Sequence, residues 1–340
     1  MIDFSKKSVK LLFFLILALG LIFIWRQFDR TIEINDSSGE NQSNQENISP
    51  LSGLACQNYQ RRIIAVAMAS DPVARPLAGL SQADLVIEMP VITNSITRIL
   101  AFYLCQDPEE IGSLRSARHD FIPLAQGFDA ILVHWGGSHF ALNWLNAGVM
   151  ENIDALTNPY NAFYRKTSQP APHNGFTDME RLIEAAQKLN YRLENNFEGY
   201  SFTQDQSQGT SNKVLRIDYA HPYNVFYQYQ SNTNSYLRYR DNWKEIDTNN
   251  GQQIEAKNII VMRVFSEQIE GPYYNDLDLE GTGECHVYQN GIIIDCLWQK
   301  SEKNPLSKLK FLDSNNQEIP LVPGQTWIEM IEPEREVTWE

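Results

Sequence analysis

Basic side chains that could bind an anion are concentrated in one part of the sequence. Arg115 and Arg118 lie three residues apart, and Arg98 precedes them on a separate apolar segment. Guanidinium groups bind carboxylates and phosphates through paired hydrogen bonds, so these three arginines predict a site for an anionic ligand. The alternative is that one of them forms a structural ion pair with Glu88 or Asp84.

A second group of polar residues follows an apolar run that is typical of a buried strand. Residues 130–133 form this run, and His134 stands at its end. Gly136 and Gly137 permit tight backbone geometry, and Ser138 is predicted to cap the N-terminus of the next helix. A strand that ends in such a turn before a helix offers backbone N–H groups to an anion.

These groups are expected to meet at one edge of a sheet. If the strands that carry Arg98 and His134 are antiparallel neighbours, both side chains lie at the same edge. A helical turn at Arg115 and Arg118 would point both the same way, and the loop around residues 172–174 could fold over them. The predicted pocket is lined by Arg98, Arg115, Arg118, His134, Gly136, Gly137, Ser138, His173 and Asn174.

Two chemical alternatives use the same region. Ser138 could act as a nucleophile with His134 and His173 as bases, which would make the protein a hydrolase or transferase, although no nucleophile-elbow motif surrounds the serine. A metal held by His134, His139 and His173 is disfavoured because no spacing typical of zinc ligands is present. The sequence therefore predicts no metal site and no cofactor.

Composition narrows the class of protein. The chain has 340 residues, of which 43% are hydrophobic, so it can bury a sizeable core. Its formal net charge of -14 argues against nucleic acid as a partner, because a protein that binds nucleic acid requires a basic surface.

The N-terminal segment predicts a membrane anchor. Leu11–Trp25 is an apolar run without charged residues, preceded by Lys6, Lys7 and Lys10 and closed by Arg26. Lysine and arginine can extend its span by reaching the interface, and the flanking charges place the N-terminus in the cytoplasm. Residues 11–25 thus predict a single-pass protein of the cell membrane whose later domains are extracytoplasmic. Together with the anion site, this anchor predicts a binding or scaffolding protein of the cell envelope, with cell-wall components and envelope proteins as the partner classes. A cleaved signal peptide is the alternative.

The rest of the chain predicts an α+β fold class. Strands are expected at residues 62–69, 84–89 and 97–105, and Thr177–Glu180 resembles a capping box before a helix. An N-terminal mixed sheet with helices is followed by a smaller, mostly-β domain. The predicted parts are a stub and anchor at 1–30, a disordered tether at 31–50, an α+β domain at 51–200, a linker at 201–213 and a β-rich domain at 214–332.

The β-rich part shows short aromatic and β-branched runs. Strands are expected at 214–218, 224–229, 236–240, 259–265 and 326–331, and Asn250-Gly251 and Asn290-Gly291 are typical of type I′ turns. The aromatic residues Tyr223, Phe226, Tyr227 and Tyr229 are predicted to form sheet core.

The turn at Asn290-Gly291 also predicts a disulfide. Residues equidistant from a two-residue turn face each other, which places Cys285 opposite Cys296. Facing residues lie about 4.5–5.5 Å apart at Cα, a separation that a disulfide tolerates. Cys56 and Cys105 remain as a second pair whose register no local turn sets.

Several ordered motifs resemble a known family, the YerB-like bacterial envelope proteins, which are typically lipoproteins. The matching motifs are Arg75-Pro76, Gly79–Asp84, Ile96–Arg98, Gly112 with Arg115–Arg118, His134 with Gly136–Ser138, Ala171–Asn174, Val225–Tyr229 and Gly324–Trp327. The resemblance implies an extracytoplasmic location but no activity, because the family lacks an established reaction. A predicted membrane helix stands where that family has a lipidated cysteine.

Overall fold

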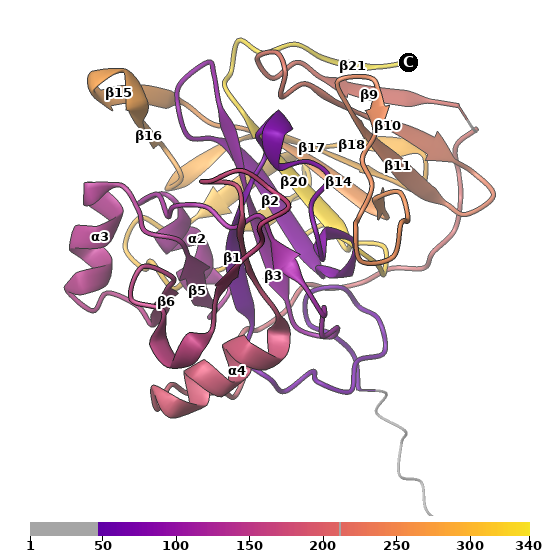
Figure 1. Cartoon of the computed structure of the whole chain (residues 1–340). Coiled ribbons are helices and arrows are strands. Elements are labelled where there is room, and N and C mark those ends of the chain that lie inside the picture. The colour runs from indigo at the N-terminus through magenta and orange to yellow at the C-terminus, as the bar shows by residue number, and fades with distance from the viewer. Residues whose placement is uncertain (1–46, 211) are drawn as a thin grey trace, which may run out of the picture. The chain divides into compact units, whose positions relative to one another are not determined.

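A mixed sheet of ten strands runs through the part of the chain that the structure describes, residues 47–210 and 212–340 of the computed structural model (Figure 1). The strand order is β19-β18-β17-β14-β20-β2-β3-β1-β5-β6. The strands are β1 (Ile64–Ala69), β2 (Leu85–Pro90), β3 (Thr97–Tyr103), β5 (Ile131–His134), β6 (Asn152–Asp154), β14 (Asn258–Arg263), β17 (Gly281–Gln289), β18 (Ile292–Lys300), β19 (Lys310–Leu312) and β20 (Thr326–Ile331).

This sheet is shared by the two regions that the sequence assigns to separate domains. β20 lies parallel to β2, with Leu85 opposite Thr326 and Glu88 opposite Glu329. β20 is also paired with β14 on its other side, and its side chains pack in the hydrophobic clusters on both faces of the sheet, so all six of its residues are buried. Residues 47–340 consequently form one compact unit, and the segment 201–213 does not separate two hydrophobic cores.

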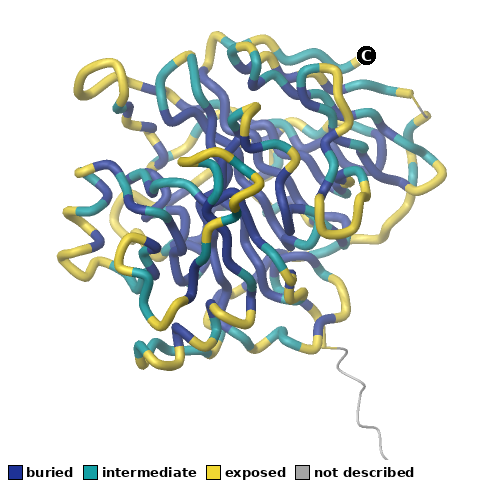
Figure 2. Tube along the Cα trace, in the orientation of Figure 1, coloured by how far each residue is buried: buried dark blue, intermediate teal, exposed yellow. Residues whose placement is uncertain are grey.

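Both faces of the ten-stranded sheet are covered. Along β1, Ala65 and Ala67 pack in the cluster that contains residues of α2 and α3, whereas Ile64 and Val66 pack in the cluster that contains residues of α4 and a second sheet. Figure 2 shows the resulting band of buried strands through the middle of the unit. The helices are α2 (Phe121–Gly127), α3 (His139–Asn146) and α4 (Met179–Lys188), with 3-10 turns η1 (Pro72–Ala74), η2 (Leu80–Gln82), η3 (Pro159–Asn161) and η4 (Gly271–Tyr273).

The second sheet has six strands among the described residues. Its strands are β9 (Val214–Ile217), β10 (Val225–Gln230), β11 (Ser235–Arg240), β12 (Trp243–Lys244), β13 (Glu255–Ala256) and β21 (Val337–Trp339). Tyr223, Tyr227 and Tyr229 pack in the core, as predicted. Phe226 does not, because residues alternate between the faces of a strand: its ring stacks on Tyr239 at 4.5 Å between centroids.

The remaining strands form two small sheets. One is a hairpin in which β15 pairs with β16, and the other has the order β4-β8-β7. Their bounds are β4 (Ile111–Gly112), β7 (Tyr164–Arg165), β8 (Gly175–Thr177), β15 (Ser266–Glu270) and β16 (Tyr274–Leu277).

Helix N-termini test two predictions about capping. Ser138 caps α3 as predicted, since its hydroxyl accepts a hydrogen bond from the Ala141 N–H. The cap of α4 is Asp178, whose carboxylate accepts from the Arg181 N–H at 2.8 Å. The predicted capping box is therefore wrong by one residue: the Thr177 hydroxyl instead donates to the Ala162 carbonyl.

Both disulfides are present. Cys285 lies opposite Cys296 in the β17–β18 hairpin and is bonded to it, which confirms the predicted register. Asn290 and Gly291 both have positive φ, as a type I′ turn requires. Cys56 is bonded to Cys105.

Asn250-Gly251 does not form the predicted type I′ turn. Only Gly251 of the pair has positive φ, and the loop is closed by the Asp247 carbonyl, which accepts from the Gly251 N–H. The side chain of Asp247 holds this loop from within, since one of its oxygens accepts from the Asn249 N–H.

The ends of the ordered unit differ from the predicted boundaries. Ser49 is fully buried and its hydroxyl donates to Asp84, so residues 47–50 belong to the compact unit and not to a tether. At the other end, β21 continues the second sheet beyond residue 332. Within the described residues no helix is both long and apolar enough to cross a bilayer, and the predicted span at 11–25 lies outside them.

Candidate functional site

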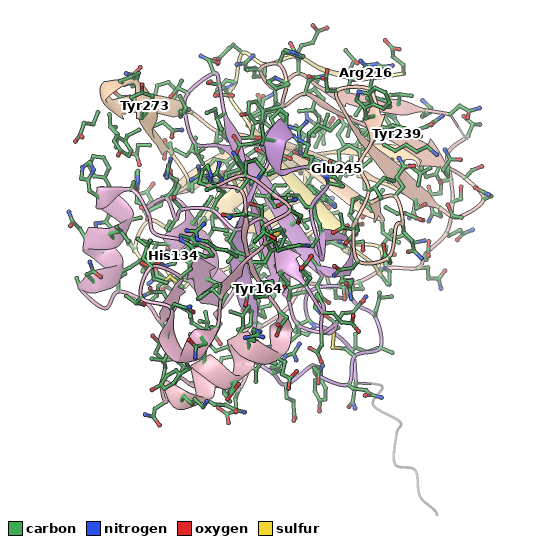
Figure 3. The ribbon with its side chains drawn as sticks, viewed as in Figure 1. His134, Tyr164, Arg216, Tyr239, Glu245 and Tyr273 are labelled. Carbon is green, nitrogen blue, oxygen red and sulfur yellow. A yellow bond between two sulfur atoms is a disulfide. The ribbon has the colours of Figure 1, made fainter. Side chains whose placement is uncertain are left out.

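Arg98 and His134 lie at the same end of the large sheet. Arg98 is the second residue of β3 and lies opposite Ala69, the last residue of β1. His134 closes β5, which runs parallel to β1 on its other side (Figure 3). The two strands are antiparallel, as expected, but β1 separates them. Alternation along each strand places both side chains on the face that α2 and α3 cover.

Arg115 and Arg118 reach this region by another route than the predicted helical turn. Helix α2 begins only at Phe121. The preceding segment is extended: the Arg115 N–H donates to the Ala67 carbonyl, and the Ala117 N–H donates to the Gly136 carbonyl. This segment therefore runs beside the ends of β1 and β5, and that position brings its arginines toward Arg98.

The three arginines form a cluster with little negative charge, which we call the arginine cluster. Arg98 is only 9% exposed, and its guanidinium donates to the Ser116 carbonyl at 2.8 Å. Arg115 pairs with Asp71 at 3.2 Å. Among the described residues Arg98 and Arg118 form no salt bridge, and the Nε atoms of Arg115 and Arg118 are buried without a hydrogen-bond partner.

Burial and the excess of positive charge in the arginine cluster shift the pKa values of Arg98 and Arg118. Burial, followed by the like charges of Arg118 and Arg115, lowers the pKa of Arg98 well below its usual range. Burial also lowers the pKa of Arg118. A buried cation without a counter-charge is costly, so an anion in this cluster would be stabilised by charges already in place.

The structural ion pairs considered from the sequence are not formed. Glu88 pairs with Arg238 and Arg240 of the second sheet. Asp84 accepts hydrogen bonds from serine hydroxyls and from the backbone N–H groups of Leu104 and Cys105. Neither carboxylate neutralises the arginine cluster.

His173 joins the cluster, whereas Asn174 does not. The Arg115 guanidinium lies 3.1 Å from the His173 ring nitrogens. Burial and the charge of Arg115 lower the pKa of His173, so the neutral ring is favoured there. The Asn174 side chain instead accepts from Arg165 at 2.6 Å.

The residues around the glycine turn have structural partners. Both ring nitrogens of the fully buried His134 are hydrogen-bonded, Nδ1 to the Gly136 carbonyl at 2.8 Å and Nε2 to Asn152 at 3.1 Å. The backbone N–H of Gly136 donates to Asp154, and that of Ser138 donates to the Ala117 carbonyl. These donors are thus used within the protein instead of being open to an anion.

The predicted nucleophile and bases are not assembled. The Ser138 hydroxyl caps α3, and no hydrogen bond joins it to His134 or His173 among the described residues. The side chains of His134, His139 and His173 also do not form a group that could share an ion within the described chain; His139 lies 3.2 Å from Glu270.

Sequence reasoning missed two kinds of site residue. Asp71 links the cluster to the segment that precedes β10, because it also accepts from the Tyr223 hydroxyl at 3.2 Å. His119 meets Asp276 across a separation of 157 residues. No local spacing could reveal this second contact, although His119 and Asp120 are adjacent in the sequence.

The fold is a mixed sheet with few helices, completed by a mostly-β C-terminal part, and known proteins share it. Residues 51–192 match the family model "Protein of unknown function (DUF3048) N-terminal domain", and residues 215–328 match its C-terminal domain. The chain belongs to this YerB-like family.

Individual relatives agree with that assignment. The chain is 32% identical over 292 residues to the "Putative lipoprotein YerB" of Bacillus subtilis (strain 168), covering 83% of this chain and 86% of the relative. It also matches the crystal structure of the YerB protein from Bacillus subtilis with a TM-score of 0.77 and 30% identity, covering 86% of this chain and 99% of the other.

Proposed function

We propose that this protein is a membrane-anchored, extracytoplasmic binding protein of the bacterial envelope whose arginine cluster binds an anionic group, a carboxylate or a phosphate. The observation that carries the proposal is Arg98: a guanidinium that is nine-tenths buried, has no carboxylate partner and lies beside two further arginines. Asp71 supplies one negative charge against the three positive charges, so two positive charges remain. A bound carboxylate would offset one of them, and a phosphate one or both.

The proposed location outside the cytoplasm is supported by observations that are independent of the arginine cluster. Two disulfides are typical of an oxidising compartment outside the cytoplasm, and the relative from Bacillus subtilis is named as a lipoprotein. The apolar run at 11–25 would serve as the anchor. Cell-wall components and envelope proteins that carry carboxylate or phosphate groups are then the partner classes that the site would fit.

Anion binding can be measured directly on the full-length protein. Isothermal titration with inorganic phosphate and with acetate is expected to show saturable binding of at least one of them. Arg98→Gln and Arg118→Gln should each weaken that binding at least tenfold, because each removes a charged hydrogen-bond donor. The matched control is Arg216→Gln, since Arg216 is exposed and stacks on Phe226 at the outer face of β9 (Figure 3).

Stability distinguishes binding from a purely structural role. Removing Arg98 relieves repulsion with Arg115 and Arg118, so Arg98→Gln should unfold no more easily than the wild type. The proposal is wrong if the wild type binds neither anion, or if both variants bind as the wild type does. A variant that loses stability but keeps its affinity would show that the cluster only holds loops together.

A further inference from the structure

A second group of polar side chains lies next to the arginine cluster and belongs to a different kind of site. His119 and Asp120 directly precede α2, and Asp276 belongs to β16 in the C-terminal part of the chain. The His119 Nε2 atom lies 2.8 Å from Asp276 Oδ1 and 3.7 Å from Asp120 Oδ1. The three side chains could each offer one atom to a shared ion.

The strongest sign of a ligand is the state of Asp120. This residue is 3% exposed, and only one of its carboxylate oxygens is hydrogen-bonded, to the Leu277 N–H at 3.1 Å. The other oxygen, Oδ2, is buried without a partner. A buried carboxylate with one unsatisfied oxygen is costly, and a cation would remove that cost.

The group opens into a cavity that has room for more ligands. The cavity has a volume of about 430 Å³, and His119, Asp120 and Asp276 all line it. Further acidic side chains, those of Glu267, Asp278 and Glu280, also line it, so its electrostatic potential favours cations over anions. Water molecules in this space could complete the coordination of an ion.

We propose that His119, Asp120 and Asp276 bind one divalent transition-metal ion, Zn²⁺ or Mn²⁺, with its remaining coordination positions open to the cavity. Ligand atoms about 2.1 Å from a tetrahedral ion lie about 3.4 Å apart, and the distances of 2.8 and 3.7 Å bracket this value. One imidazole with two carboxylates suits Zn²⁺ or Mn²⁺, whereas Ca²⁺ and Mg²⁺ prefer oxygen ligands alone.

The β15–β16 hairpin supplies the third ligand, so this site joins the two sequence segments of the family. The hairpin packs on α3 through Tyr274, whose ring lies 5.2 Å from that of His139 and 5.8 Å from that of Phe140. Figure 3 marks its tip with Tyr273. Bound metal would therefore link the hairpin to the segment before α2. This site does not depend on the anion site.

The test uses the full-length protein after treatment with EDTA and removal of the chelator. Titration calorimetry with ZnCl₂ and with MnCl₂ is expected to show one ion per chain for at least one metal. Asp276→Asn should weaken binding at least tenfold; its side chain is about half exposed, so folding should be unaffected. Asp120→Asn should do the same and keeps an acceptor for the Leu277 N–H.

A surface pair of the same chemistry provides the control. His286 and Asp295 face each other across β17 and β18, with Nε2 and Oδ1 3.5 Å apart. Asp295→Asn should leave the metal affinity and stoichiometry unchanged. The proposal is overturned if neither metal binds saturably, if Asp276→Asn and Asp120→Asn bind as the wild type does, or if Asp295→Asn abolishes the binding.

Discussion

Two buried glutamates in one ion network, Glu88 and Glu329, are expected to differ in how much stability the protein loses when each is replaced by glutamine. Arg238, fully buried in β11, lies at the centre of the network between the two sheets and contacts Glu88, Glu245 and Glu329. Burial opposes ionisation of Glu88, but Arg240 and Arg238 outweigh it and lower its pKa to about 2. Burial and the nearby charge of Glu88 raise the pKa of Glu329, although Arg238 acts against them.

The magnitudes follow from these shifts. Lowering the pKa of Glu88 from an ordinary value near 4.5 to about 2 corresponds to about 3 kcal/mol of stability at neutral pH. Glu88→Gln should therefore lower the free energy of unfolding at pH 7 by about 3 kcal/mol, since it also leaves two buried arginines short of a counter-charge. Glu329→Gln should cost less than about 1 kcal/mol, because the amide resembles the protonated acid that burial favours.

The pH dependence provides a second measurement of the same energy. A carboxylate whose folded pKa is lowered contributes stability above its unfolded pKa and loses it as the pH falls toward the folded value. The difference between wild type and Glu88→Gln should thus shrink between pH 4.5 and pH 2. Urea unfolding followed by tryptophan fluorescence suits this test, since Trp327 stacks under Arg238 at 3.9 Å.

Equal losses of stability in Glu88→Gln and Glu329→Gln would contradict the reasoning. So would a difference between wild type and Glu88→Gln that stays constant from pH 5 to pH 2. Either result would mean that the negative charge of the network resides mainly on Glu329 or is shared evenly.

Two further predictions concern stability. In metal-free protein at pH 7, Asp120→Asn should raise the free energy of unfolding by about 3 kcal/mol, because burial raises the pKa of this carboxyl to about 6. Urea unfolding should show this gain above pH 6, and the gain should disappear below about pH 4. A loss of stability at pH 7 would contradict the prediction. Removing the Cys56–Cys105 bond by paired alanine substitutions should lower the free energy of unfolding by about 4 kcal/mol, and removing Cys285–Cys296 should lower it by about 3 kcal/mol. The difference is expected because the closed loops differ in length, with sequence separations of 49 and 11. The opposite order in denaturant midpoints would contradict this account.

Local patterns in the sequence determine much of the secondary structure. The strand at residues 326–331 and the cap at Ser138 follow from β-branched and aromatic content and from a side-chain oxygen placed before a helix. The Cys285–Cys296 bond follows from one turn, because Asn290-Gly291 sets the register of the whole hairpin. Each of these features depends on residues that are close in the chain.

Pairings between distant segments were decided only by the tertiary structure. The sequence indicated Arg98, Arg115 and Arg118 as an anion-binding group, but it could not show that Glu88 would be taken by Arg238 and Arg240. Nor could it place Asp276 beside His119 or β20 beside β2. Strand order and the partner of a buried charge depend on how whole elements pack, and spacing along the chain carries no information about that packing.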